Sequence, residues 1–311
     1  MNRESVEAYV RDILTRADFE QSPTYVKSVV FDIIGRRDDL TLIIKILLNI
    51  DTLKEEFASG MKTLSSTLSA SPLLIGLKSG SYPLDPGVIY MRHGIPALNP
   101  HTLAEYLLEE IPPMVFTAPG GYYVKIDGRK LRKLREERGV SLGTLARIAG
   151  VSRRAIQMYE SGEICASVDI AMRLEEFFDE PLAVPLNPFH YDEKTAEECE
   201  PKSGIEREIY ENLSRIGYEV HYLVRCPFEA VANDRKRKVY LTGIERGNEN
   251  LKMKARIVRE ISRVTYTDSF IVVQREINRK RIEDTPIVTL RELRSMRNAY
   301  ELRKLLEERE N

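Results

Sequence analysis

Two adjacent arginines near the middle of the chain carry groups that could bind nucleic acid. They stand in the stretch GVSRRAIQMYESG, residues 150–162, where Ser152 can cap a helix that begins with Arg153 and Arg154. A guanidinium can donate two parallel hydrogen bonds to the edge of a guanine base or to a phosphate. An ordinary surface helix could carry the same residues, so the surrounding elements must decide between the two interpretations.

Signals for short helices lie on both sides of this stretch. Three helices, each with a capping residue and a closing glycine, are predicted from Asp127 to Gly139, from Ser141 to Gly150 and from Ser152 to Gly162. A fourth helix is predicted to begin near Val168. Two short helices joined by a tight turn, with the small Ala146 where they cross, are typical of a helix-turn-helix.

The charges of this segment support binding to a phosphate backbone. Between Arg129 and Arg154 the chain has nine lysines and arginines, and only Glu136 and Glu137 oppose them. The formal net charge of the whole chain is −1. Such a local excess attracts DNA, and the affinity should fall steeply with salt.

The segment LRKLREERGVSLGTLARIAGVSRRAIQMYESG resembles the Cro/CI-type helix-turn-helix family. In that family an arginine and a glutamate form a structural ion pair, and these positions correspond to Arg135 and Glu160. Where many members have a glutamine after the cap of the second helix, this chain has Leu142. The DNA contacts expected from this resemblance and from the local charge are Ser141, Thr144, Ser152, Arg153, Arg154, Gln157, Met158, Lys130 and Lys133.

Within this resemblance the roles of the individual contacts differ. The start of the third helix meets base edges in the family, which assigns base contact to Arg153 and Arg154. Either arginine could instead hold a phosphate, because most protein–DNA hydrogen bonds go to the backbone. The two lysines are expected to contact phosphates, and Ser141 or Thr144 would have to replace the missing glutamine contact.

The segments that flank this module resemble each other. The sequence FDIIGRRDDLTLIIKILLNID, from Phe31, aligns without gaps with FEAVANDRKRKVYLTGIERGN, from Phe228. Each copy reads as helix, strand, strand, helix, strand, helix, which predicts an α/β sheet with packed helices. The predicted fold class is therefore mixed: a central all-α helix-turn-helix domain between two duplicated α/β domains.

The strand–turn–strand pattern of the first copy resembles the restriction-endonuclease-like superfamily, whose motif is PD-(D/E)xK. Asp32 matches the front acid and Lys45 the lysine, but Ile43 stands where the second acid should be. Metal-assisted phosphodiester cleavage needs converging carboxylates. We therefore expect a vestigial centre in which Asp32 and Lys45 form an ion pair at a strand edge, unless Asp38 or Asp39 reaches a metal.

The second copy departs further from the motif. Glu229 matches the front acid, while Tyr240 and Thr242 stand at the positions of the second acid and the lysine. Both copies are thus expected to be degenerate. The sequence predicts a protein that is not an enzyme and that needs neither a metal nor another cofactor.

Composition shifts divide the chain into four predicted segments. These are an α/β domain at 1–120, the helix-turn-helix domain at 121–189, an acidic linker at 190–204 and the second α/β domain at 205–311. A single last helix is predicted at 290–306. It could pair with a second protomer or pack on its own sheet.

The bulk composition favours a reduced, soluble setting. Hydrophobic residues make up 42% of the chain and charged residues 31%. No leader segment or long apolar run is evident, so we expect neither secretion nor membrane insertion. The three cysteines form no CxxC pair and the four histidines no metal-ligand spacing.

As a whole, the chain resembles an archaeal family of helix-turn-helix transcriptional regulators. The resemblance implies a cytoplasmic, nucleoid-associated regulator that reads double-stranded DNA in the major groove with helix 153–161, as a homodimer. The flanking domains would serve dimerisation, backbone contact or sensing of a small-molecule effector, and the turn-rich stretch 80–96 could line a ligand cleft or simply lead into a strand. Two alternatives remain: a Mg²⁺-dependent nuclease targeted by the helix-turn-helix, and an antitoxin-like or chromatin-like interaction scaffold.

Overall fold

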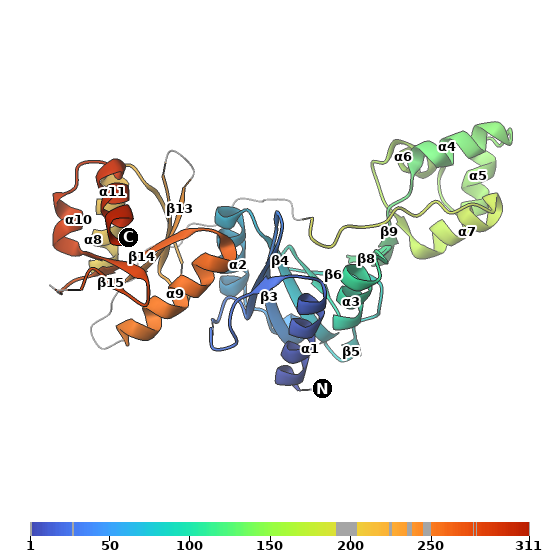
Figure 1. The fold of residues 1–311 in the computed structure, drawn as a ribbon. Coiled ribbons are helices and arrows are strands. Elements are labelled where there is room, and N and C mark those ends of the chain that lie inside the picture. The colour runs from blue at the N-terminus through green and yellow to red at the C-terminus, as the bar shows by residue number, and fades with distance from the viewer. Residues whose placement is uncertain are drawn as a thin grey trace.

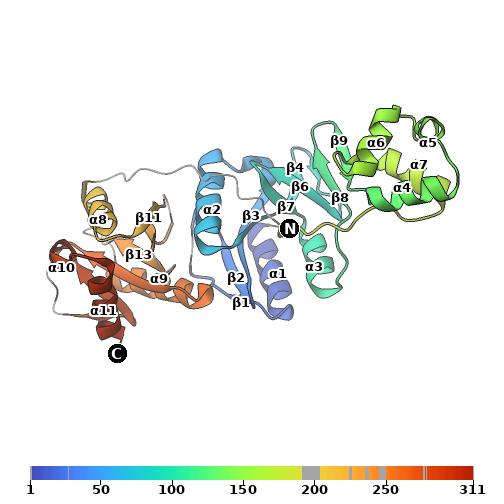
Figure 2. The ribbon, with the colours of Figure 1, turned by 90° about the horizontal axis from the view of Figure 1, so that it is seen from above.

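Three units follow one another in the computed structural model, which describes residues 2–26, 28–190, 204–223, 226–234, 238–244, 250–275, 277 and 279–310. The N-terminal α/β unit lies in the middle, the helix-turn-helix unit at one end and the C-terminal α/β unit at the other (Figures 1 and 2). The fold is therefore mixed, as predicted, with an all-α module set between two α/β units in the sequence.

The N-terminal unit is a sheet with helices on both faces. Strand order is β1-β2-β3-β4-β7-β6, with β5 paired to β4. The almost uninterrupted apolar run of β3 fits a strand that is covered on both sides. The elements are α1 (Arg3–Arg16), β1 (Glu20–Gln21), β2 (Ile33–Arg37), β3 (Leu40–Asn49), the 3-10 helix η1 (Ile50–Thr52), α2 (Glu55–Leu68), β4 (Ser71–Ser79), β5 (Tyr82–Pro83), β6 (Val88–Arg92), β7 (Ile95–Leu98) and α3 (Pro100–Leu108).

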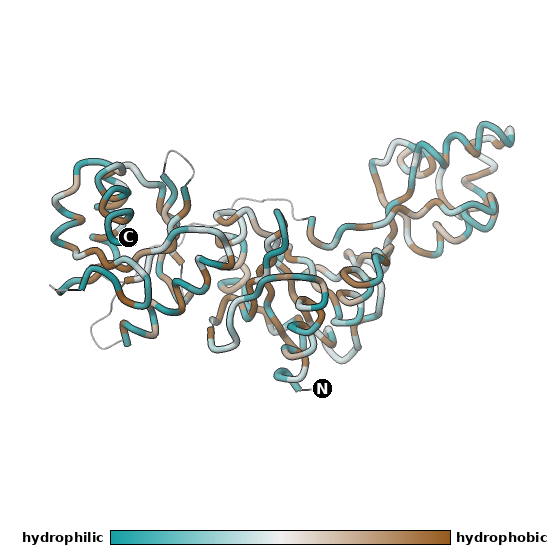
Figure 3. The backbone as a smooth tube through the Cα atoms, viewed as in Figure 1, coloured by the Kyte–Doolittle hydropathy of each residue, from teal (hydrophilic) through white to brown (hydrophobic). Residues whose placement is uncertain are grey.

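The helix-turn-helix unit is attached through a hairpin that extends this sheet. Strand β8 pairs in parallel with β6, and β9 pairs with β8 and β10. The four helices alternate hydrophobic and hydrophilic stretches along the backbone, as expected for amphipathic helices around a small core (Figure 3). The elements are β8 (Val115–Ala118), β9 (Gly121–Val124), α4 (Gly128–Glu137), α5 (Leu142–Ala149), α6 (Arg153–Ser161), β10 (Ala166–Ser167) and α7 (Val168–Phe178).

The C-terminal unit repeats the topology of the N-terminal one. Its strand order is β11-β12-β13-β14-β16-β15. In both units the first three strands pair antiparallel to one another, and the next two strand pairings in the sheet are parallel. The elements are α8 (Gly204–Arg215), β11 (Glu219–Tyr222), β12 (Ala230–Asn233), β13 (Val239–Ile244), α9 (Leu251–Thr265), β14 (Asp268–Val273), β15 (Arg281–Ile282), β16 (Thr285–Thr289), α10 (Leu290–Ser295) and α11 (Ala299–Glu310).

Besides a cluster of its own, each α/β unit contributes to one hydrophobic cluster that both have in common. Phe31 and Ile43 from the N-terminal unit lie in the same buried cluster as Phe228, Leu241 and Val258 from the C-terminal unit. Helix α9 packs on its own strands β13 and β14 and also on β2 of the other unit. The duplicated domains are therefore joined inside the chain as two halves of a fused pair.

Polar and cation–π contacts reinforce this junction. The guanidinium of Arg36 donates to the carbonyl of Thr265 at 3.0 Å and lies 4.4 Å from the ring centre of Tyr266. On the neighbouring part of the junction, Arg256 lies 4.8 Å from the ring centre of Tyr25. Residues far apart in the sequence thus fix the two halves against each other.

The predicted last helix is wrong in one respect. The expected single helix at 290–306 is divided into α10 and α11, with Met296 in an extended conformation between them. The Asn298 side chain accepts a hydrogen bond from the Glu301 amide at 3.1 Å and so caps the second helix. The break lets Leu293 and Leu302 enter the core of their own unit, which favours packing on its own sheet over pairing with a second protomer.

The predicted segment boundaries can be compared with the packing. Gly120, the predicted last residue of the first domain, lies in the turn between β8 and β9. The core of the helix-turn-helix unit extends to Leu182 and Ala183, while Leu186 and Phe189 return to the core of the N-terminal unit. Of the predicted linker, all but His190 and Gly204 lies outside the described residues.

Candidate nucleic-acid interface and the acid–lysine centres

Helix α6 turns one face to the core and the other to solvent. Ile156 and Tyr159 are buried, which fixes the orientation of the helix. The hydroxyl of Ser152 accepts from the Ala155 amide at 3.1 Å and caps its first turn. On the opposite face Arg153, Arg154 and Gln157 are exposed and Met158 is half-buried.

The side chain of Arg153 lies against helix α5. A Cβ atom added to Gly143 would be 2.8 Å from Nε of Arg153, so the glycine leaves room for this guanidinium. Nearby, Ser141 accepts from the Thr144 amide at 3.1 Å, and the two hydroxyls lie 2.9 Å apart. Arg153 therefore lies beside the start of α5, where the two hydroxyls predicted to contact DNA also lie.

Leu142 packs against the core of the unit and is half-buried. The apolar side chain explains locally why the polar contact expected of the family is missing here.

Arg135 and Glu160 form the predicted scaffold ion pair. Nε and one terminal nitrogen of Arg135 donate to the two carboxylate oxygens of Glu160 at 2.5 and 3.0 Å. The side chains are 13% and 9% exposed. The hydrogen bonds to Glu160 hold the pKa of the Arg135 guanidinium above its ordinary value, so this pair joins α4 to α6 in its charged form.

The two lysines of α4 differ in their surroundings. Nζ of Lys130 lies 2.8 Å from a carboxylate oxygen of Glu180 and donates to the carbonyl of Pro181 at 2.9 Å. Lys133 extends into solvent and makes only a 3.8 Å pair with Glu137 one turn away. Lys133 is therefore the more accessible of the two for a phosphate.

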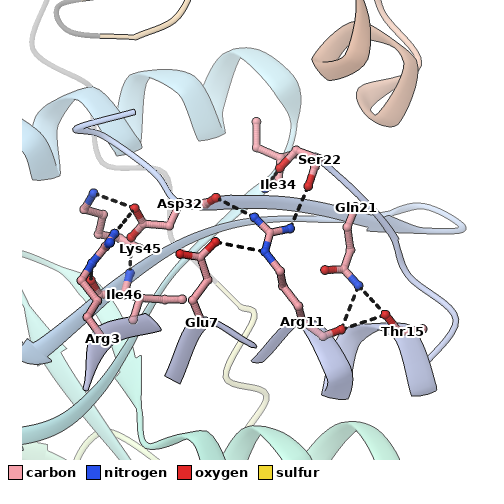
Figure 4. Close-up of polar contacts among 10 residues, drawn as sticks. All are labelled: Arg3, Glu7, Arg11, Thr15, Gln21, Ser22, Asp32, Ile34, Lys45 and Ile46. Carbon is pink, nitrogen blue, oxygen red and sulfur yellow. Dashed lines mark hydrogen bonds and ion pairs between the residues drawn. The ribbon is translucent and has the colours of Figure 1, made fainter. Parts of the chain in front are cut away.

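Asp32 in the N-terminal unit is surrounded by donors (Figure 4). One oxygen accepts from Arg3 at 2.5 Å and from Lys45 at 3.2 Å, and the other accepts from the Ile46 amide at 2.7 Å. Burial lowers the pKa of the Lys45 ammonium, although the adjacent Asp32 carboxylate counteracts this effect. The expected ion pair between Asp32 and Lys45 is present, and Arg3 from α1 joins it.

A divalent metal does not fit this arrangement. Ile43, at the position of the second acid, points into the core shared by the two α/β units. Glu7 is paired with Arg11 at 3.0 Å. Asp38 and Asp39 lie exposed in the turn at the far end of β2, away from Asp32. In the described part of the chain, no three His, Cys, Asp or Glu residues gather in a way that could hold a metal.

The second centre differs from the sequence prediction. The strand register pairs Ile33 with Ile44 but Ala230 with Thr242, so Glu229 lies opposite Gly243 rather than Thr242. The assignment of Thr242 to the lysine position is therefore wrong, because the second hairpin is one residue longer than the first. Tyr240, assigned to the second acid, is buried in the unit's own core.

A lysine from a helix completes the second centre instead. One oxygen of Glu229 accepts from the Ile244 amide at 2.7 Å, as Asp32 accepts from Ile46, and the other lies 2.6 Å from Nζ of Lys254 in α9. A single alignment could not find Lys254, because it lies on a different element from Lys45. Both halves thus bury a carboxylate against an ammonium, from different sequence positions.

Charges from both centres influence the same cysteine. Desolvation raises the pKa of the Cys226 thiol to about 12; a hydrogen bond with Ser28 and the charge of Lys45 oppose this shift, whereas the charge of Glu229 adds to it. Groups from both halves therefore act on one side chain at the junction.

A cavity of about 450 Å³ lies beside the attachment of the helix-turn-helix unit. Ile89, Met91 and Pro96, from the turn-rich stretch expected to line a cleft, form part of its wall. Lys62 and Lys125 add two cations to the lining.

Two family models match this chain. A model described as a PD-(D/E)XK superfamily domain matches residues 3–113, and a helix-turn-helix model matches residues 131–184. A solved restriction-modification controller protein, C.AhdI from Aeromonas hydrophila, is 32% identical over 17% of this chain and 80% of its own, with a TM-score of 0.17. Within the described residues, no helix has the length and apolar character needed to cross a membrane.

Full-length relatives come from several archaea. The name "Putative HTH-type transcriptional regulatory protein" is carried by a protein of Methanocella arvoryzae, 37% identical over 100% of this chain and 98% of its own length. A Pyrococcus abyssi protein of the same designation is 37% identical over 99% of this chain and 98% of its own. The molecule is thus a helix-turn-helix protein with a restriction-endonuclease-like domain. It belongs to the archaeal family of HTH-type transcriptional regulatory proteins.

Proposed function

We propose that this protein is a transcriptional regulator that binds specific double-stranded DNA sites, with α6 lying in the major groove. The observation that carries the proposal is the exposed row of Arg153, Arg154 and Gln157 on a helix fixed by buried Ile156 and Tyr159. Arginine and glutamine side chains can form paired hydrogen bonds to guanine and adenine edges. The ion pair between Arg135 and Glu160 supports a rigid scaffold behind this row.

One module of this kind reads a short site, so we further propose that the regulator acts as a homodimer on two half-sites about one helical turn apart. A cytoplasmic, nucleoid-associated location follows from this function. The cavity beside the attachment of the helix-turn-helix unit is a candidate site for a small-molecule effector.

The test of sequence reading compares three proteins on a library of random duplexes. Wild type should enrich a short, palindromic site, and Arg154→Ala should reduce discrimination at one base position by about 1–3 kcal/mol. Lys133→Ala should weaken all duplexes about equally. If Arg154→Ala keeps both the preferred sequence and its selectivity, α6 does not read bases through this residue.

We also propose that neither acid–lysine centre cleaves DNA. The oxygens of Asp32 are occupied by Arg3, Lys45 and the Ile46 amide, and Ile43 replaces the second acid. Incubation of the selected duplex with the protein and Mg²⁺ should leave its ends intact. Cleavage that disappears in Asp32→Ala would instead support the nuclease alternative, while absence of any shared sequence, together with a copurifying partner, would support the scaffold.

A further inference from the structure

Helix α9 of the C-terminal unit carries a row of cations along its exposed face. Ala255, Val258 and Ile261 are buried against the sheet and fix the helix orientation. Positions separated by three or four residues share a face of a helix. The exposed cations on the opposite face follow this spacing and are Lys252, Arg256, Arg259 and Arg263.

The charged row continues into the segment around β15. Ile277 and Ile282 pack on the cluster that contains Leu251 and Ala255, so this segment lies beside the beginning of α9. Its exposed cations are Arg275, Arg279, Lys280 and Arg281. We call these four and the four cations of α9 together the α9–β15 basic surface.

Few acids oppose this surface. From residue 252 to residue 281 the sequence has nine cations, of which Lys254 is buried against Glu229, and three acids; Glu283 and Asp284 follow directly. Glu260 pairs with Arg263 at 3.6 Å and Glu283 with Lys252 at 3.3 Å, yet Arg263 and Lys252 remain 68% and 76% exposed. Lys252 and Arg263 therefore stay accessible to solvent although each has an acidic neighbour.

The duplication supplies an internal comparison. In the N-terminal unit the equivalent helix is α2, and residues 55–84 correspond to residues 252–281. That stretch has two acids, Glu55 and Glu56, and two cations, Lys62 and Lys78. Because both copies have the same topology, the fold alone does not require a basic row here.

We propose that the α9–β15 basic surface binds the phosphate backbone of duplex DNA, as a second attachment point separate from α6. This proposal rests on the proposed function for the choice of duplex DNA. The eleven residue steps from Lys252 to Arg263 span about 16 Å, the length of roughly five phosphates along one strand. Arginine-rich surfaces with few acids bind DNA by releasing counterions, without reading sequence.

The apolar residues of this region argue against a protein partner. Met253 and Tyr266 are exposed but lie at opposite ends of α9, and Tyr266 is covered on one side by Arg36. They do not form the central apolar patch on which protein interfaces depend. Because this surface and α6 belong to different units, attachment of one raises the effective concentration of DNA at the other when both reach the same duplex.

The experiment replaces three cations and keeps the fold contacts. The test variant is Arg259→Gln, Arg263→Gln and Lys280→Gln; Arg256 is kept because it stacks on Tyr25 across the junction. The matched control removes the same charge elsewhere, with Arg16→Gln, Lys78→Gln and Lys304→Gln, all exposed. Binding to the selected duplex and to an unrelated duplex is measured across salt concentrations, and the unfolding midpoint is measured for each variant.

The test variant should bind both duplexes about tenfold more weakly in 0.1 M salt, and its slope of log affinity against log salt should be shallower by about 2 to 3. The preferred sequence should stay the same. A variant with Arg259→Lys and Arg263→Lys keeps the charge and should retain wild-type affinity, which guards against loss of fold as the cause. Equal affinities and slopes in the test variant and the control would overturn the proposal.

The two proposals fail in different ways. If Arg154→Ala has no effect but the test variant still loses affinity and salt dependence, α6 does not read the base sequence, and DNA binding by the α9–β15 basic surface is supported. If Arg154→Ala changes sequence preference while the test variant behaves as the control does, base reading by α6 is supported and DNA binding by the α9–β15 basic surface is refuted. A wild-type protein that binds neither duplex overturns both.

Discussion

The guanidinium of Arg153 owes its position to an absent side chain. Gly143 lies in the first turn of α5, and any Cβ there would approach Nε of Arg153 at 2.8 Å. The atom that must give way is the far end of a flexible side chain, so the fold can accept the change. The contact thus controls the aim of Arg153 more than the stability of the unit.

Gly143→Ala separates these two effects. The alanine should stabilise the protein by up to about 1 kcal/mol, because glycine is a poor helix former. It should also displace Arg153 and weaken binding to the selected duplex. Chemical denaturation of this variant checks the change in stability, and a titration with the selected duplex checks the change in binding. Wild-type affinity for the duplex would show that Arg153 contributes nothing from its position beside α5.

Single residues also mark the limit of what the sequence could predict. The cap of α6, the buried positions Ile156 and Tyr159 and the pair of Arg135 with Glu160 followed from local spacing and from family resemblance. The partner of Glu229 did not, because Lys254 lies on another element and the hairpin before it is one residue longer than in the first copy. A gapless alignment carries no information about such a change of register.

At the scale of elements, the most consequential packing is that of α9 and β12 against the N-terminal unit. Phe228, just before β12, is fully buried in the cluster that contains residues of both halves. The sequence predicted two related sheets but not their contact, because each copy alone accounts for its own alternation of apolar residues. Only the arrangement in space reveals a junction of this kind.

Phe228→Ala tests whether the halves depend on each other. Removing this ring should cost about 3–5 kcal/mol and weaken both halves together. Hydrogen exchange should show faster exchange of the β3 amides in the N-terminal unit. Phe178→Ala removes an equally buried ring from the core of the helix-turn-helix unit and should leave β3 protected. If Phe228→Ala leaves the exchange of β3 unchanged, the halves are not energetically coupled.

For the whole molecule, the cores predict two cooperative parts. The helix-turn-helix unit has its own hydrophobic cluster, while the two α/β units, besides clusters of their own, have one in common. The β8–β9 hairpin and the return of residues 186–189 connect the parts. Calorimetry of the intact protein should therefore resolve two unfolding transitions rather than three.

Arg135→Ala assigns one of these transitions. It leaves Glu160 buried without its partner and should destabilise the helix-turn-helix unit by about 3 kcal/mol, so only that transition moves to lower temperature. Arg132→Ala is the matched control on the same helix, since its pair with Glu136 is exposed and should contribute little to stability. A shift of both transitions in Arg135→Ala would contradict the independence of the two parts.

The junction of the two α/β halves also bears on how such a protein can change over generations. In a symmetric pair of identical subunits, every substitution appears twice, at positions related by the rotation axis. Here each half has its own codons, so one half could acquire a cationic helix while the other has a helix with two acids and one lysine. Fusion of the two copies in one chain allows their sequences and functions to diverge.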